Sequence, residues 1–231
     1  MPRWTGQPSK LRWESEKGTA DASNNRRFEQ SLKNPGILQL KGATFDHVSL
    51  TTLFSYLDNR VARTVSVLKA IFKFELENLE EEGHRNRRIS LAMTFTSSKL
   101  STCSYSDVET GGLSGFDDYF IILLEAWTSG NTRSLPDAVQ AIHNCLMVCC
   151  EHQRFFVTAK RYMGLGPACM RDGDIIVVLY GGDVPFILRP ISDTEYAFMG
   201  GCAIFDIMHG EIFKKLDQGE EGVEERTFVL V

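Results

Sequence analysis

Three side chains that could bind zinc, Cys145, Cys149 and His152, are spaced four and then three residues apart. On a helix this spacing brings the three groups close enough to approach one metal ion. A structural zinc site needs a fourth ligand, which Cys169 or Cys202 would have to supply from a distant segment. Cys149 also continues the apolar stripe of the predicted helix. We therefore expect buried free thiols at this face, with no bound metal and no cofactor.

A second set, Cys169, His209 and Arg189, combines a thiol nucleophile, a base and a cationic group. Placed around one mouth of a small barrel, the three side chains would suit a thiol-dependent enzyme or a ligand-binding site. The chain lacks a Gly-x-Ser-x-Gly segment. Cysteine and histidine are also common enough to be paired by chance. We predict a protein that is not an enzyme, and keep the small enzyme or ligand-binding barrel as the alternative.

Arg189 stands beside Pro190 at the end of a predicted strand, where a guanidinium can contact an anion or a protein partner. A surface ion pair with Asp193 or Glu195 is the competing interpretation. Asp174 closes a turn, which a carboxylate stabilises by accepting backbone N–H groups. The residues that we predict as contacts to a protein partner are Arg189, Asp174, Tyr162 and His209.

The elements that carry these side chains are short strands. Residues 175–180 and 184–188 are apolar and β-branched, and a glycine-rich link at residues 181–183 predicts a hairpin. A turn at residues 171–174 precedes the hairpin, and residues 195–200 resume the strand pattern. Gly-Leu-Gly-Pro at residues 164–167 is interpreted as a turn between strands. This spacing predicts a small antiparallel barrel or a strongly bent sheet.

Upstream of residue 154 the pattern changes to a helical one. Apolar residues recur every three or four positions between Leu53 and Leu79, and again between Leu135 and Cys149. Two short strands, 37–40 and 43–48, are predicted around Lys41-Gly42. The expected fold class is therefore α+β, with a helical middle segment packed on a small C-terminal antiparallel β-barrel or bent sheet. The expected divisions are a disordered tail or linker remnant (1–35), a mainly helical region with a short N-terminal strand pair (36–153) and a β-rich, barrel-like region (154–231).

The composition excludes several classes of partner. The net charge of −5 gives no overall field that attracts nucleic acid, so we predict no nucleic-acid binding. No signal peptide is visible, and no apolar run reaches the roughly 20 residues that span a bilayer. We expect a soluble, cytoplasmic protein.

An ordered series of motifs extends from a phenylalanine pair at residues 155–156 to a Met-x-Gly-Glu at 208–211. Between them lie Gly-Leu-Gly-Pro (164–167), Gly-Asp (173–174), Gly-Gly (181–182), Val-Pro-Phe (184–186) and Leu-Arg-Pro (188–190). This series resembles the C-terminal region of fungal heterokaryon-incompatibility (HET-domain) proteins. The resemblance implies a recognition or regulatory module in allorecognition and programmed cell death, with a protein partner acting in cis or in trans.

The namesake domain of that family lies upstream of these motifs. Its usual marks, a Ser-Tyr-x-Trp-Gly segment and a Trp-Ile-Asp-x-x-Cys-Ile strand, do not occur before Gly36. The resemblance therefore implies a chain that lacks the effector domain, and we expect that this chain expressed alone is not toxic.

Overall fold

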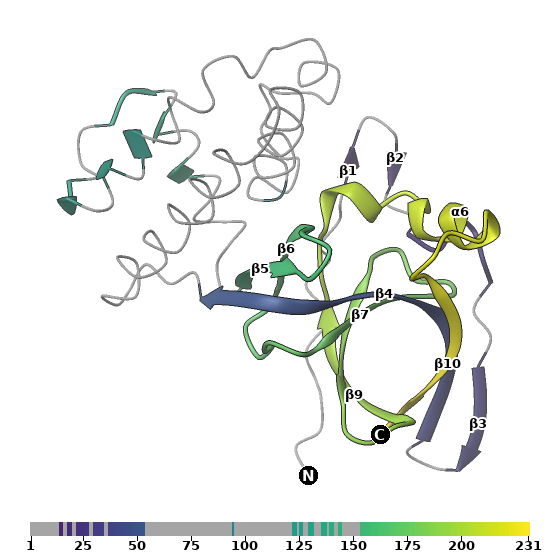
Figure 1. Ribbon diagram of the computed structural model, residues 1–231. Coiled ribbons are helices and arrows are strands. Elements are labelled where there is room, and N and C mark those ends of the chain that lie inside the picture. The colour runs from purple at the N-terminus through teal and green to yellow at the C-terminus, as the bar shows by residue number, and fades with distance from the viewer. Residues whose placement is uncertain are drawn as a thin grey trace.

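The computed structural model describes residues 14–15, 18–19, 22–27, 30–34, 37–53 and 153–231, together with single residues between 94 and 144. Strands are the main regular element among these residues (Figure 1). The strands are β1 (Glu14–Ser15), β2 (Gly18–Thr19), β3 (Gln30–Asn34), β4 (Ile37–Leu53), β5 (Gln153–Thr158), β6 (Met163–Pro167), β7 (Ile175–Leu179), β8 (Phe186–Pro190), β9 (Glu195–Gly201) and β10 (Glu224–Leu230). A 3-10 turn (Phe205–Ile207) and the helix α6 (Glu211–Asp217) separate β9 from β10.

Eight strands form one sheet in which β4 has the central position. The hydrogen-bonded order is β10-β9-β8-β7-β4-β5-β6, and β3 pairs with the beginning of β4. Strand β10 also pairs with β4 in antiparallel register, from Glu224 opposite Thr44 to Leu230 opposite Leu38. Hydrogen bonding therefore continues from β4 through β7, β8 and β9 to β10 and returns to β4. We call these five strands the ring.

The predicted fold class is wrong. The described residues form a mainly β structure with a mixed sheet, because β9 and β10 run parallel where Val229 lies opposite Glu195. The sheet also depends on β4, which precedes the middle segment and lies where the sequence predicted a short strand pair. Among the described residues α6 is the one complete α-helix, and it has seven residues. The helical segments predicted between residues 53 and 149 lie almost entirely outside the described residues.

Strand β4 is continuous through Lys41-Gly42, where the sequence suggested a break between two strands. Gly42 lies between β7 and β10, opposite Leu179 on one side and Arg226 on the other. A Cβ atom at Gly42 would lie 2.5 Å from the carbonyl oxygen of Val178. Glycine at this position therefore permits close approach of a neighbouring strand and does not make a turn.

The predicted hairpin is confirmed as β7 and β8, with Ile175 opposite Leu188. Gly181 in the connecting link has φ of 75°, a left-handed conformation that glycine adopts without strain. By contrast, the Gly-Leu-Gly-Pro segment at residues 164–167 is not a turn but most of strand β6, paired with β5. The ring of Phe156 fills the space over Gly164, where a Cβ atom would lie 2.3 Å from it.

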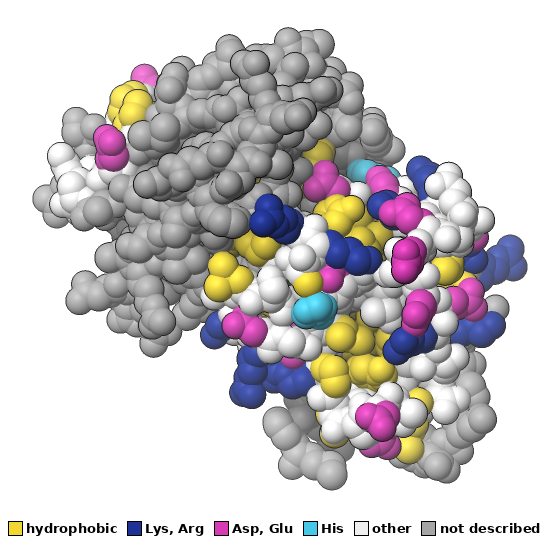
Figure 2. All heavy atoms as spheres, in the orientation of Figure 1, with side chains coloured by type: hydrophobic (Ala, Val, Ile, Leu, Met, Phe, Trp, Pro, Cys, Tyr) yellow, Lys and Arg dark blue, Asp and Glu magenta, His cyan; other side chains and the backbone are white. Residues whose placement is uncertain are grey.

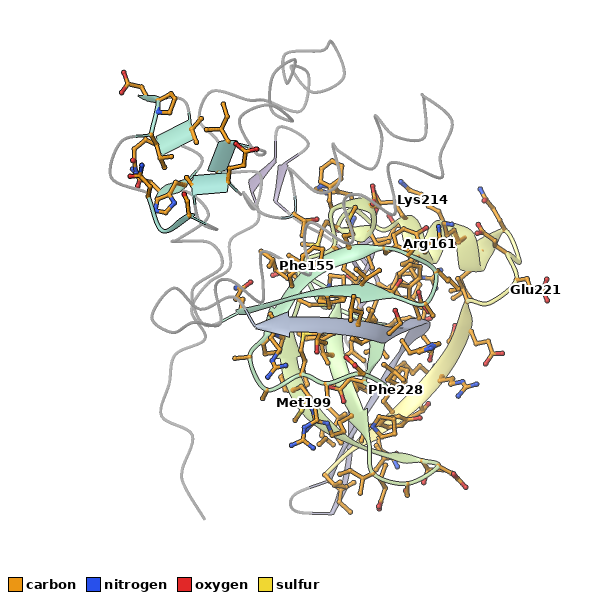
Figure 3. All side chains as sticks on the ribbon, turned by 60° about the vertical axis from the view of Figure 1, so that its left-hand side comes forward. Phe155, Arg161, Met199, Lys214, Glu221 and Phe228 are labelled. Atoms are coloured by element: carbon orange, nitrogen blue, oxygen red, sulfur yellow. The ribbon has the colours of Figure 1, made fainter. Side chains whose placement is uncertain are left out.

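Alternation along the strands divides the apolar side chains between two cores. One core lies on the outer face of the ring and includes Phe45 of β4, Phe156 of β5 and Phe213 of α6. The other takes side chains from all five strands of the ring, so it fills the ring's interior. Its buried members are Leu40, Val177, Leu179, Leu188, Tyr196, Phe228 and Leu230. Figure 3 shows Phe228 among the strands of the ring, whereas Lys214 and Glu221 project outward.

Residues 22–27 are built into this fold. The backbone N–H groups of Ala22 and Ser23 donate to the carbonyl oxygens of Asp183 and Gly182, in the β7–β8 link. Both side chains are buried. This segment therefore packs against the end of the hairpin, and β3 follows it and pairs with β4. The boundary that the sequence suggested at residue 35 falls between two paired strands. In the described part of the chain, every helix is too short or too polar to cross a membrane.

Candidate functional site

Asp174 and Arg189 form a bidentate ion pair at the end of the β7–β8 hairpin. The guanidinium donates from Nε to Asp174 Oδ1 (2.8 Å) and from NH2 to Oδ2 (2.9 Å). Asp174 is 2% exposed and also accepts the backbone N–H of Arg171, which fixes the turn at residues 171–174. The hydrogen bond to Asp174 raises the pKa of Arg189. This pair is charge-assisted and geometrically specific, so it holds the turn against the end of β8.

The sequence selected both members of this pair but not the contact between them. Arg189 was expected to pair with Asp193 or Glu195, and it pairs with Asp174. The predicted hairpin already implied this contact. Residues just before the first strand of an antiparallel hairpin, such as Asp174, lie beside residues at the end of the second strand, such as Arg189. The same guanidinium also donates to the carbonyl oxygen of Cys169 at 2.8 Å.

The other two predicted contact residues lie elsewhere. The ring of Tyr162, between β5 and β6, packs edge-on against Phe45 with centroids 4.7 Å apart. His209 precedes α6, and its backbone N–H donates to Oε2 of Glu211. Asp174 is buried, so a partner at this end of the hairpin would meet Arg189 first. A role for these residues in partner contact stays a prediction.

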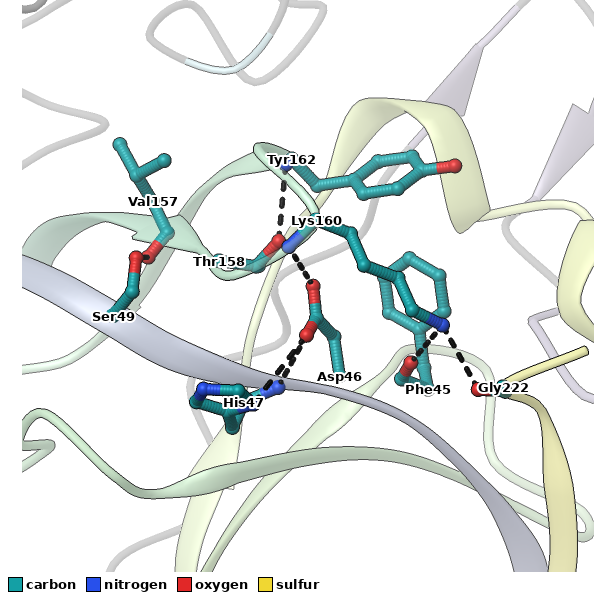
Figure 4. Close-up of polar contacts among 9 residues, drawn as sticks. All are labelled: Phe45, Asp46, His47, Ser49, Val157, Thr158, Lys160, Tyr162 and Gly222. Atoms are coloured by element: carbon teal, nitrogen blue, oxygen red, sulfur yellow. Dashed lines mark hydrogen bonds and ion pairs between the residues drawn. The ribbon is translucent and has the colours of Figure 1, made fainter.

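The β5–β6 turn is held by a second polar cluster, around Asp46 (Figure 4). The buried carboxylate of Asp46 accepts the backbone N–H groups of His47 (2.8 Å) and Lys160 (2.7 Å). The ammonium group of Lys160 donates to the carbonyl oxygens of Phe45 and Gly222. The carboxylate of Asp46 and the ammonium group of Lys160 both form hydrogen bonds to backbone atoms. The cluster therefore joins β4, the β5–β6 turn and the segment that precedes β10.

The exposed Cys169 has its thiol 3.7 Å from the carbonyl oxygen of Met199. Cys202 is buried, and burial raises the pKa of its thiol well above the ordinary value, which keeps it protonated. No group of three or more metal-ligating side chains occurs within the residues that the structure describes. Cys145, Cys149 and His152 lie outside those residues, so the zinc hypothesis is untested by the fold.

Sequence reasoning missed a cluster that joins residues 22–27 to β10. Arg26 donates to the Tyr180 hydroxyl (3.3 Å) and packs over the ring of Phe213 at 4.5 Å. The Tyr180 hydroxyl donates in turn to Oε2 of Glu225 (2.7 Å). Burial, and then the hydrogen bond to Glu225, raise the pKa of Tyr180. Because Arg26 lies 154 residues from Tyr180 in a polar segment, no local pattern in the sequence points to the contact.

We predict that Tyr180→Phe lowers the free energy of unfolding by about 1 kcal/mol near pH 8, because the hydroxyl hydrogen bonds are lost. The fold favours the neutral phenol, so this contribution is present below the ordinary tyrosine pKa of about 10 and is lost as the pH rises above it. Urea unfolding at pH 8 and at about pH 10.5 should show the difference between the two proteins shrinking. An equal difference at both pH values would contradict this assignment.

Charged side chains of both signs are interspersed over the face drawn in Figure 2, with groups of hydrophobic side chains between them. No large patch of a single sign occupies the described surface in that view. The described residues also form local ion pairs, such as Asp174 with Arg189. The absence of nucleic-acid binding stays a prediction from the net charge.

The described chain is therefore a β-sheet domain whose ordered polar clusters brace turns and strand ends. Residues 132–223 match the family model described as the Het-6 beta-barrel domain. The chain is 37% identical over 65 residues to heterokaryon incompatibility protein 6, OR allele, of Neurospora crassa; the match spans 27% of this chain and 10% of that relative. No solved structure matches the chain.

These two matches confirm the resemblance drawn from the motifs between residues 155 and 211. The chain carries a region typical of the C-terminal part of heterokaryon-incompatibility proteins. The matched range ends at residue 223, directly before β10, and it excludes β4. Two strands of the ring therefore come from outside the segment that identifies the family.

Proposed function

We propose that this chain acts in fungal heterokaryon incompatibility as a non-catalytic recognition or regulatory module. The observation that carries the proposal is the pairing of Asp174 with Arg189 inside the segment that matches the family. The Gly-Asp and Leu-Arg-Pro motifs supply the two members of this pair, and both groups are engaged in bracing the hairpin. The ion pair between these motif residues holds the turn at residues 171–174 against the end of β8. A recognition module requires a surface of fixed shape, and this pair maintains one.

The partner in this proposal is a protein, joined in cis or met in trans. The Neurospora relative is named for heterokaryon incompatibility, and the family resemblance links that name to recognition between fused cells of unlike genotype. A module of this kind would distinguish partners through the turns and strand ends that the polar clusters hold in place. Arg189, Tyr162 and His209 remain our candidates for the residues that face the partner.

The test is a fusion assay between fungal strains of unlike genotype, one of which expresses this chain. We expect the chain to change the fraction of fused cells that die, and to leave growth unaffected when it is expressed without fusion. The variant Cys169→Ser should behave as the unaltered chain does, because a recognition module does not need a thiol nucleophile.

Each outcome of this assay bears on the proposal. Loss of the effect in Cys169→Ser, at equal amounts of folded protein, would favour the thiol-dependent enzyme. Growth arrest before fusion would indicate an effector and not a regulator. A chain that leaves cell death unchanged in every pairing would overturn the role in incompatibility itself.

A further inference from the structure

The interior of the ring is incompletely filled at one end. Alternate positions of each strand supply the inner side chains, and most are well covered. Toward the end formed by the start of β4 and the end of β10, Leu38 and Phe186 are only half-buried. Phe198 is 47% exposed and Val231 is 50% exposed at the same end. The apolar side chains of the interior thus continue to this end of the ring, where the described side chains leave an opening. We call this opening the mouth of the ring.

A pocket of about 480 Å³ occupies this mouth. Its deeper wall consists of buried interior residues, and the half-exposed residues form its rim. The side chains that define it are Leu38, Leu40, Leu179, Phe186, Phe198 and Leu230. Small-molecule sites in proteins have volumes of about 300–1,000 Å³ and often lie at the mouths of closed sheets.

The chemistry of the lining restricts the occupant. No lysine, arginine, histidine, aspartate or glutamate lines the pocket. A charged group placed there would lose its hydration without gaining a partner. The one polar side chain among the lining residues belongs to Tyr180, and its hydroxyl is hydrogen-bonded to Glu225. The side chains of the lining therefore favour an uncharged and predominantly apolar ligand.

We infer that the mouth of the ring binds a small, uncharged lipophilic molecule. The depth of the pocket favours such a ligand over a second protein surface, because Leu40, Leu179 and Leu230 belong to the interior of the ring. Phe198 packs against Phe186 with centroids 5.5 Å apart, which places an aromatic wall at the rim. This inference goes beyond the proposed role in incompatibility and does not depend on it.

The probe for the test is N-phenyl-1-naphthylamine, an uncharged lipophilic dye that fluoresces when it leaves water. Titrated into the purified full-length chain, it should bind with saturation at one molecule per chain. Phe198→Ala should weaken binding at least fivefold, since it removes a wall of the pocket from a half-exposed position. Leu38→Trp should block binding by filling the pocket from the rim.

Ile191→Ala is the matched control, because Ile191 is 58% exposed and lies outside the pocket. It should leave the affinity of the dye unchanged. Absence of saturable binding, or equal weakening by the Phe198 and Ile191 variants, would overturn the inference. Binding of one dye per two chains, with a dimer in sedimentation, would assign the mouth to a second copy instead. The assay uses purified protein, so its failure is distinct from failure of the fusion assay.

Discussion

Replacing Asp174 with alanine is expected to lower the free energy of unfolding by about 2–4 kcal/mol. Removing one member of a buried ion pair typically costs about 3–5 kcal/mol. The lower range applies here because the side chain of Arg189 is one-quarter exposed and water can solvate it in part. The variant also leaves the backbone N–H of Arg171 without the carboxylate that accepts it. Urea unfolding followed by circular dichroism measures the loss.

A double-mutant cycle separates the pair from the general effect of mutation. Arg189→Met leaves a buried carboxylate without its counter-ion, so it should be at least as destabilising as Asp174→Ala. The double variant should lose less than the sum of the two single losses, by about 1–3 kcal/mol, because neither charge is left uncompensated. Asp172→Asn, in the same turn but exposed, is the control and should change stability by less than about 0.5 kcal/mol. Additive losses would show that the pair is not coupled.

The parts of the fold that the sequence predicted are those fixed by local signals. The β7–β8 hairpin has apolar, β-branched runs on both sides of a glycine link, and the structure confirms it. The turn before Asp174 was also found, because its carboxylate acts on a backbone N–H only three residues away. Both features depend on contacts within a few residues of one another.

The errors occurred where glycine has a tertiary role. Gly42 was placed in a break between two short strands and Gly164 in a turn, and both lie within strands. Each leaves room for a neighbour, the β7 backbone at Gly42 and the Phe156 ring at Gly164. A sequence does not distinguish a glycine that bends the chain from one that admits another strand, because the difference lies in residues far along the chain.

Strand β10 was missed for a related reason. The segment has four exposed residues, Glu224 to Thr227, before its buried end, so its first half lacks the apolar pattern of a strand. It becomes a strand through pairing with β4, more than 180 residues earlier. The polar clusters show the same dependence on distance along the chain. The role of Asp174 was identified because its turn is local, whereas the contact between Arg26 and Tyr180, 154 residues apart, was not identified.

Gly42→Ala is expected to destabilise the fold by about 2–3 kcal/mol, although alanine ordinarily stabilises a strand relative to glycine. The added Cβ would lie 2.5 Å from the Val178 carbonyl oxygen and 3.0 Å from the Leu179 Cα. Both obstacles are backbone atoms of β7, so relief requires the two strands to separate. If Gly42 instead made a turn with two short strands beside it, the neighbouring backbone would not limit the side chain.

Gly201→Ala provides the matched control on β9. Its added Cβ would meet the Val184 side chain at 3.1 Å, and a methyl group can move where a paired backbone cannot. We expect a change below about 1 kcal/mol there. Amide hydrogen exchange should locate the effect of Gly42→Ala, with faster exchange in β7 and β10, the two strands that flank Gly42. Unchanged stability and exchange in this variant would contradict the close approach of β4 and β7, on which closure of the ring depends.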